Sequence, residues 1–175
     1  RNFGIQNAQG EWIAFLDSDD WWTTDKLQLC VSNINNEVDF IYHALEINYY
    51  KYPSYLKKNS LQGRQLNKPI LLDLLLGGIK KGNAIGNSSV VVRKNILSKI
   101  GGINENKKLV GSEDYNTWLR IAQITDKFKY LENKLGYNLI HDGGVSKKDM
   151  SIPQREAVAE FMKLFNTEQK TNLEV

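Results

Sequence analysis

Residues 11–20, Glu11-Trp12-Ile13-Ala14-Phe15-Leu16-Asp17-Ser18-Asp19-Asp20, join a short apolar run to three closely spaced aspartates. The run is rich in aromatic and branched residues, follows Gly10 and stops at Asp17. Such a segment is typical of a buried strand that ends in a turn. We therefore expect a strand over 11–16 whose carboxyl end presents an acidic loop.

The segments that follow predict helices around a sheet. A helix is expected over 25–35, with Thr23 or Thr24 as its cap. Its apolar stripe, at the three- and four-residue spacing of a helix face, consists of Leu27, Cys30, Val31 and Ile34. Residues 38–42 predict a second strand. This strand–helix–strand order indicates an α/β fold with a parallel sheet flanked by helices.

Periodicity and turn residues predict the remaining elements. Helices are expected over 70–76, 94–100, 112–123 and 151–165, the first closed by Gly77-Gly78 and the last followed by a polar tail that frays. Strands are expected over 88–92, 127–130 and 135–140, the last two separated by a turn. Residues 46–68 indicate a hairpin-like excursion or a mobile loop. Residues 1–150 form the main domain in this interpretation, and residues 151–175 form a C-terminal helix and tail.

Composition restricts the class of protein. The chain has 175 residues, 41% of them hydrophobic, and its net charge of +3 contains no run that would indicate a nucleic-acid partner. Its one cysteine, Cys30, fits a reducing compartment. The longest apolar run, 70–79, is too short to span a bilayer, and no secretory signal opens the chain. Because the chain begins at Arg1 without a methionine, we expect it to be a piece of a longer protein.

The three aspartates at 17, 19 and 20 indicate a cation site. Their carboxylates repel one another unless a cation or several backbone N–H groups neutralise them. Oxygen ligands without a cluster of Cys or His favour Mg²⁺ or Mn²⁺, which bridge to substrate phosphates. The alternative is an acidic turn that begins the next helix. A calcium-binding EF-hand is excluded, because Trp22 stands where its glycine is required and Gln28 where its bidentate glutamate is required.

A second acidic pair, Glu113-Asp114, follows Ser112 at the start of a predicted helix. Acids are common in a first helical turn, so each residue alone indicates little. The helix terminus favours the ionised form of Asp114, which suits a carboxylate that accepts a proton from a hydroxyl. His141, at the end of a predicted strand, is by itself more typical of an ordinary surface residue than of a ligand.

Taken in order along the chain, these segments resemble the family-2 glycosyltransferases with a GT-A fold. The first matching block runs from Arg1-Asn2-Phe3-Gly4-Ile5 to the D-x-D motif at Asp17-Ser18-Asp19, and Trp22 and Asp25-Lys26-Leu27 continue it. The second comprises residues 88–102 and Ser112-Glu113-Asp114 with the following Trp118-Leu119-Arg120. The third spans 135–146. Departures are Thr24 in place of a proline, Asn116 in place of an aspartate and Ile103 in place of an aromatic residue.

The resemblance implies a partial GT-A, Rossmann-like mixed sheet flanked by helices. Residues 1–150 would be the C-terminal two-thirds of that domain, and the nucleotide-binding half that precedes this stretch in the family would be missing. The implied activity is a hexosyltransferase-type reaction that moves a sugar from a nucleotide diphosphate sugar to an acceptor hydroxyl, with inversion and with Mn²⁺ or Mg²⁺ as cofactor.

The same resemblance implies roles for individual residues. Asp114 is the catalytic base, and Asp19 is the principal metal ligand, with His141 as a further metal or diphosphate contact. The donor is bound by Arg1, Asn2 and Asp17. Support of the loop or contact with the acceptor is assigned to Asp20, Glu113 and Trp22, and Trp21 or Trp22 could form an apolar platform for a sugar ring.

Partners and location follow from the resemblance alone. The donor is expected to be a UDP-sugar and the acceptor a glycan or a lipid-linked sugar, with no nucleic acid. The expected location is cytoplasmic, peripheral to the inner face of a bacterial plasma membrane, where polysaccharides or glycolipids are assembled. An exposed sheet edge could be covered by self-association into a homo-oligomer.

Two alternatives stay open at this point. One is a catalytically inactive fragment, or a remnant that binds a sugar or nucleotide without transferring it. The other is a haloacid-dehalogenase-like phosphohydrolase, in which Asp17 would be the nucleophile. That motif requires Thr or Val where this chain has Trp21, so it ranks below the transferase.

Overall fold

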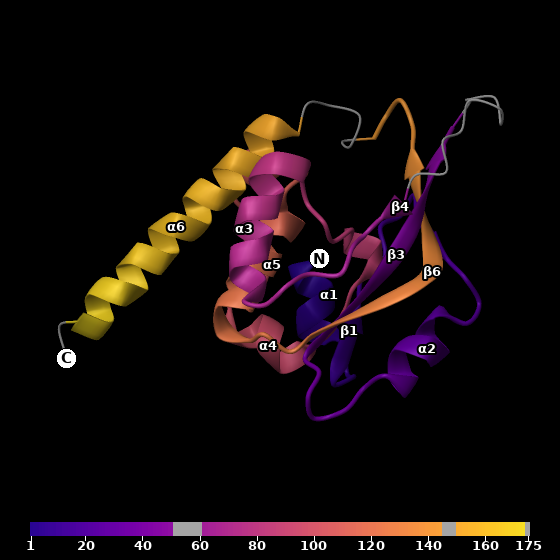
Figure 1. The fold of residues 1–175 in the computed structure, drawn as a ribbon, viewed down its shortest axis with the longest axis horizontal. Helices are drawn as coiled ribbons and strands as arrows, with labels where there is room; N and C mark the ends of the chain where they lie inside the picture. The colour runs from indigo at the N-terminus through magenta and orange to yellow at the C-terminus, as the bar shows by residue number, and fades with distance from the viewer. Residues whose placement is uncertain (51–60, 145–149, 174–175) are drawn as a thin grey trace.

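The computed structural model describes residues 1–50, 61–144 and 150–173, and within these ranges six strands form one mixed sheet (Figure 1). The strand order is β1 (Trp12–Ala14), β5 (Val91–Arg93), β3 (Phe40–Tyr49), β6 (Phe128–Ile140) and β2 (Trp21–Trp22), with β4 (Leu61–Gln62) paired to β3. Strand β5 runs antiparallel to both β1 and β3, so β1 and β3 are parallel but not adjacent. Strand β3 pairs with β6 in parallel. The α/β class and the mixed sheet are thus confirmed.

Helices cover both faces of this sheet. The α-helices are α1 (Asn2–Asn7), α2 (Lys26–Ser32), α3 (Ile70–Lys81), α4 (Lys94–Lys99), α5 (Glu113–Ile124) and α6 (Ser151–Leu173), with 3₁₀ turns η2 (Asn87–Ser89) and η3 (Lys107–Leu109). Helices α3 and α5 lie on one face, the long α6 packs outside them, and α2 lies on the opposite face (Figure 1). None of the helices in the described ranges has the length and apolarity needed to cross a bilayer.

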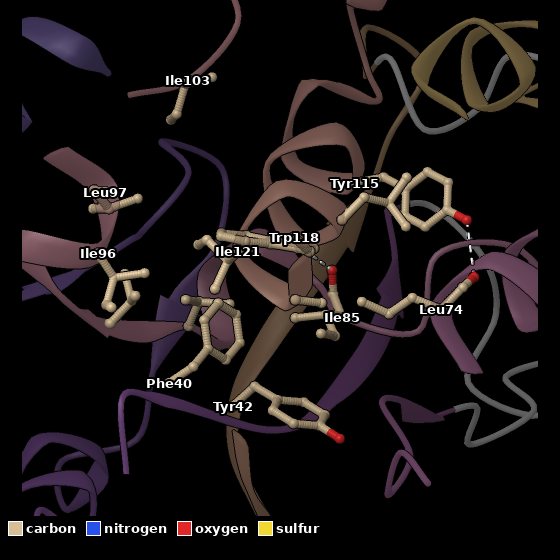
Figure 2. Close-up of a cluster of buried hydrophobic side chains, with 14 of the residues drawn as sticks. Phe40, Tyr42, Leu74, Ile85, Ile96, Leu97, Ile103, Tyr115, Trp118 and Ile121 are labelled. Carbon is tan, nitrogen blue, oxygen red and sulfur yellow. Dashed lines mark hydrogen bonds between the residues drawn. The ribbon is translucent and has the colours of Figure 1, made fainter. Parts of the chain in front are cut away.

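The main core lies between the sheet and α5, as Figure 2 shows. The Trp118 ring of α5 meets the Phe40 ring of β3 edge-on, with ring centroids 5.1 Å apart. Its indole N–H donates to the carbonyl of Ile85 at 3.3 Å, and the Tyr115 hydroxyl donates to the carbonyl of Leu74 at 2.9 Å. Each large apolar side chain buried in this way contributes about 1.5–3 kcal/mol. These contacts hold the start of α5, and therefore residues 113 and 114, in a fixed place.

The predicted apolar stripe of the segment that contains α2 is confirmed for Cys30 and Ile34, which pack in the core, and wrong for Leu27 and Val31. Leu27 and Val31 are 50% and 62% exposed, whereas Lys26 and Cys30 are fully buried against the sheet. Residues 26 and 30, one helical turn apart, face the core together. The Lys26 Nζ lies 3.5 Å from the centroid of the Trp22 ring, a contact that stabilises a cation.

Strand β6 also differs from the prediction, because residues 128–140 form one strand rather than two strands joined by a turn. Both halves pair with β3 in parallel, and the register shifts on either side of Ala44. A bulge absorbs the extra residues that the sequence suggests as a turn. The two halves are therefore not a hairpin.

The bounds of several other elements also differ from the prediction. Helix α3 continues through Gly77-Gly78 to Lys81, and a Cβ at position 77 would lie 2.5 Å from the guanidinium of Arg64, so Gly77 permits a close approach instead of ending the helix. Residues 87–89 form a 3₁₀ turn before β5. Strand β4 returns along β3 as a hairpin-like excursion, of which residues 51–60 lie outside the described residues.

The last helix is longer than predicted, since α6 extends to Leu173 where the sequence predicts a tail. It packs on α5, and the buried Asn116 side chain donates to the carbonyl of Ala157 at 2.9 Å. The predicted helices over 94–100 and 112–123 are confirmed, and each of their boundaries lies within one residue of the prediction. The division of the chain at residue 150 stays a prediction.

Candidate active site

A cavity of about 510 Å³ opens between the loop that follows β1 and the first turn of α5. Both predicted acidic clusters line it, although they are almost 100 residues apart in the chain. The lining residues used below are Arg1, Asp17, Asp19, Asp20, Asn83, Asn87, Glu113, Asp114 and His141. The sequence predicts two groups with complementary roles, and the fold brings them into one hollow.

The loop after β1 is held by hydrogen bonds to two of its three aspartates. The Ser88 hydroxyl donates to Asp20 Oδ2 at 2.5 Å and accepts from the backbone N–H of Asp17 at 3.0 Å. The backbone N–H of Leu139 donates to Asp20 Oδ1 at 3.0 Å. Burial raises the pKa of Asp20, and the bonds from Ser88 and Leu139 oppose that rise. Asp20 therefore ties the loop to β6.

Arg1 connects the two acidic clusters. Its Nη2 donates to Asp17 Oδ1 at 2.6 Å, and its Nη1 donates to Glu113 Oε1. The Asn87 amide also donates to Asp17 Oδ1, at 2.8 Å, and the N–H of Gly111 donates to Glu113 Oε2 at 2.7 Å. Asp17 and Glu113 are thus neutralised by protein groups. The bonds of Glu113 support an orienting role more than contact with an acceptor.

Asp114 lines the cavity, and both of its carboxylate oxygens are hydrogen-bonded. The Asn83 amide donates to Oδ2 at 3.0 Å, and the backbone N–H of Tyr115 donates to Oδ1 at 2.7 Å. Burial, with the nearby charge of Glu113, raises the pKa of Asp114 to about 7, while the Tyr115 N–H and Arg1 act in the opposite direction. A carboxylate with a pKa near neutral pH can accept and release a proton under physiological conditions.

Asp19 differs from its neighbours because its side chain is the most exposed of the three, at 41%. Its Oδ2 lies 3.1 Å from His141 Nε2. The backbone N–H of Gly143 donates to His141 Nδ1 at 3.2 Å, so in the neutral ring the proton resides on Nε2 and points to Asp19. This tautomer favours a hydrogen bond from His141 to an anion over direct ligation of a metal.

The donor set around Asp19 fits a divalent cation that takes most of its ligands from substrate and water. Within the described ranges, no three His, Cys, Asp or Glu side chains converge on one point as a complete metal cage would. Mg²⁺ is commonly bound by one or two carboxylates together with substrate phosphates. Asp19 could supply such a carboxylate, since Asp17 and Asp20 are occupied by other groups.

Two residues predicted for the site lie outside the cavity lining. The Asn2 amide donates to the carbonyl of Ile103 at 2.8 Å and accepts from its N–H at 2.8 Å. Trp22 is half-buried, and its indole N–H donates to the carbonyl of Ser88 at 2.7 Å. Trp21 is 44% exposed and stacks on Tyr137 with ring centroids 5.1 Å apart. Asn2 thus holds the segment at residue 103, Trp22 holds the segment at residue 88, and neither lines the main cavity.

Sequence reasoning missed three polar residues of the site, Asn83, Asn87 and Ser88. All three belong to the stretch Gly82-Asn83-Ala84-Ile85-Gly86-Asn87-Ser88-Ser89, which precedes β5 and is rich in small polar residues. Strand β5 lies beside β1, so its preceding loop meets the end of β1 where the aspartates lie. The polar composition of this stretch could have indicated a site, but which residues it meets depends on the order of the strands in the sheet.

Proteins of similar sequence are glycosyltransferases. Residues 1–147 match the family model described as "Glycosyltransferase like family 2". The chain is 32% identical over 125 residues to the Escherichia coli UDP-Glc:alpha-D-GlcNAc-diphosphoundecaprenol beta-1,3-glucosyltransferase WfgD, an alignment that covers 70% of this chain and 43% of WfgD. It is 30% identical over 147 residues to WfaP, an E. coli glucosyltransferase of the same description, with 83% and 52% covered.

A solved structure shows the same fold. The Staphylococcus aureus protein TarS, residues 1–349, in complex with UDP-GlcNAc, superimposes with a TM-score of 0.56 at 16% identity, over 84% of this chain and 40% of that one. The chain thus spans about half the length of the curated relatives it matches. The family match favours the transferase over the phosphohydrolase alternative.

Proposed function

The chain belongs to glycosyltransferase family 2, and from that premise we propose that its main cavity transfers a sugar from a UDP-sugar to a hydroxyl of a lipid-linked sugar acceptor. The observation that supports the proposal is the shared cavity, whose lining includes both the acidic loop after β1 and Asp114. The names of WfgD and WfaP, which describe UDP-glucose as donor and a diphosphoundecaprenol-linked sugar as acceptor, support this choice of substrates.

We assign the donor's diphosphate to the Asp19 side of the cavity. A divalent cation bound there, Mn²⁺ or Mg²⁺, would neutralise charge on the departing diphosphate. His141 would donate from Nε2 to a phosphate oxygen, and Asp19 would supply a carboxylate ligand to the cation. Arg1, bound to Asp17 and Glu113, lies between this side and α5 and holds the two clusters at a fixed separation.

We assign the base role to Asp114. In the proposed step the acceptor oxygen attacks the anomeric carbon, the bond to the diphosphate breaks, and the hydroxyl proton passes to the Asp114 carboxylate. A direct displacement of this kind inverts the anomeric carbon and needs one base and no enzyme nucleophile. The pKa of about 7 supports this role, because it lies near the pH at which a base is both ionised and able to take a proton.

A transfer assay tests the proposal. The intact protein is incubated with Mn²⁺, a panel of UDP-sugars that includes UDP-Glc, and a short-chain decyl GlcNAc-α-diphosphate as acceptor. We expect release of UDP and a disaccharide product with at least one donor. Binding of UDP-Glc without any product would support the alternative of a sugar- or nucleotide-binding remnant. Neither binding nor product across the panel would refute the proposal.

The proposed acceptor also bears on location. A lipid-linked acceptor would bring the protein to the cytoplasmic face of a membrane as a peripheral protein, as the resemblance suggests. Self-association through a sheet edge stays a prediction, with β1 and β2 at the two ends of the strand order.

A further inference from the structure

A second cavity, of about 450 Å³, adjoins the main one on the side of β3 and β4. The two cavities share the lining residues Gln62, Gly82, Asn83, Asn138 and Ile140. Its volume lies within the roughly 300–1,000 Å³ that small-molecule sites occupy. The two hollows are therefore continuous along one wall.

The second cavity opens beside the proposed base and away from the acidic loop. Asn83, which lines both cavities, donates to Asp114 Oδ2 at 3.0 Å. Neither Asp19 nor His141, the residues assigned to the diphosphate, lines the second cavity. A hydroxyl that attacks the sugar on the face opposite the diphosphate must approach from the side of the base. The second cavity provides room for the molecule that carries this hydroxyl.

The walls of this cavity are apolar and amide-bearing rather than charged. Ile47, Leu61 and Ile140 supply apolar surface, and Gln62 and Asn138 supply amides that lie 3.4 Å apart. The side chains of Ile47 and Asn138 share a face because these residues are register partners in β3 and β6.

The charged side chain that lines the second cavity is paired with a carboxylate. Arg64 is the only charged residue among the described residues that line the second cavity, and its Nη1 donates to Asp73 Oδ2 at 3.1 Å. An anion would therefore find no free cation there. A sugar ring matches the walls better, because it has apolar C–H faces and hydroxyl groups that both donate to and accept from amides.

We infer that the second cavity binds the uncharged terminal sugar of the acceptor and presents its hydroxyl to Asp114. This inference rests on the proposed function, since it assigns the acceptor of that reaction. It names Ile47, Leu61, Gln62 and Asn138 as residues that recognise the acceptor, of which Ile47 and Leu61 line the second cavity alone.

The experiment fills the second cavity from a wall that the main cavity does not share. Ile47→Trp is compared with the wild-type protein and with Ile124→Trp, an isoleucine at the end of α5 that is 46% exposed and lines neither cavity. Leu61→Trp, at a residue that is 53% exposed, provides a second variant that the fold tolerates more readily. Two rates are measured with UDP-Glc and Mn²⁺: transfer to decyl GlcNAc-α-diphosphate, and hydrolysis of the donor without acceptor.

We expect both cavity variants to raise the KM for the acceptor by about tenfold or more, which corresponds to about 1.4 kcal/mol of lost binding, with donor hydrolysis within about twofold of wild type. Ile124→Trp should change neither rate. If a folded Leu61→Trp protein has an unchanged KM for the acceptor, the assignment of the second cavity to the acceptor is overturned. Transfer by the wild-type protein would still uphold the proposed function in that case. If the wild-type protein transfers sugar to no acceptor, both the acceptor assignment and the proposed function are overturned.

Discussion

Asp114 shows how single residues set the chemistry of this cavity. Its carboxyl group is surrounded by protein, which raises its pKa to about 7, and two N–H donors favour its ionised form. The resemblance implies that Asp114 is the base, and its place in a first helical turn predicts that its ionised form is favoured, whereas burial raises its pKa instead. The sequence could not predict the raised pKa, since the burial that causes it depends on the loop containing Asn83, which lies 31 residues earlier in the chain.

The Asn83 amide should tune the pH dependence of activity. Its Oδ1 accepts from the N–H of Ile85 at 3.0 Å, so its NH₂ group is fixed toward Asp114. Asn83→Ala removes a donor to the ionised form, so the pKa of Asp114 should rise and the acid limb of kcat/KM should move to higher pH. A shift of about one pH unit is expected, because a hydrogen bond to a charged group contributes about 1.5–3 kcal/mol.

The readout is the pH–rate profile of transfer between pH 5 and 9. Asn7→Ala is a matched control, because Asn7 is exposed and its side-chain amide donates to the carbonyl of Phe3 in the same helix, away from Asp114. A lower kcat with an unmoved acid limb would show that Asn83 supports the loop without acting on Asp114.

The sequence pattern predicted some of the helices and strands correctly and others incorrectly. The period of apolar residues located α4 and α5 because their buried faces follow the sequence pattern. It failed in part for α2, where the Lys26 stem is buried and Leu27 and Val31 are exposed. It also failed for β6, because the pairing with β3 that keeps residues 128–140 in one strand comes from a distant segment.

The buried charge of Lys26 in α2 should lower the free energy of unfolding of the protein. Its side chain is fully buried, and among the described residues no hydrogen-bond partner of its Nζ is found. Burial lowers its pKa from 10.5 to about 8. Lys26→Met keeps the apolar stem and removes the charge, so the free energy of unfolding at pH 7 should rise by about 1–3 kcal/mol.

The pH dependence of that gain follows from linkage. Between pH 8 and 10.5 the unfolded chain holds the Lys26 proton and the folded protein loses it, so the stability of wild type rises with pH in this window. The advantage of Lys26→Met, measured by urea unfolding, should therefore shrink from pH 7 to pH 10. Lys129→Met, at an exposed lysine of β6, serves as control. A less stable Lys26→Met protein at pH 7 would mean that the contact with Trp22 outweighs the desolvation of the charge.

At the scale of the whole molecule, strand order explains why the site exists. The three sequence blocks lie far apart in the chain, and the order β1-β5-β3-β6-β2 places the loops after β1, before β5 and after β6 around one cavity. Resemblance to family 2 identified those blocks correctly. It did not reveal the second cavity, whose walls come from β3, β4 and β6 and whose shape depends on how these strands pair.

The donor side of the cavity should depend on Asp19. Asp19→Ala removes the carboxylate that we assign to the cation, so Mn²⁺-dependent binding of UDP-Glc, followed by calorimetry, should fall below detection. Asp25→Ala is the matched control, because Asp25 is exposed and makes no side-chain cap to α2. Unchanged Mn²⁺-dependent affinity in Asp19→Ala would exclude the ligand assignment.

The most direct measurement compares donor binding and transfer in Asp114→Asn, a change that keeps the size of the side chain and the hydrogen bond from the Tyr115 N–H while it removes the carboxylate. If Asp114 is the base across the cavity from the diphosphate, the variant binds UDP-Glc and Mn²⁺ with wild-type affinity while its transfer rate falls by about 10²–10⁴-fold. Transfer at a near-wild-type rate, with the donor bound normally, would contradict this account of the active site.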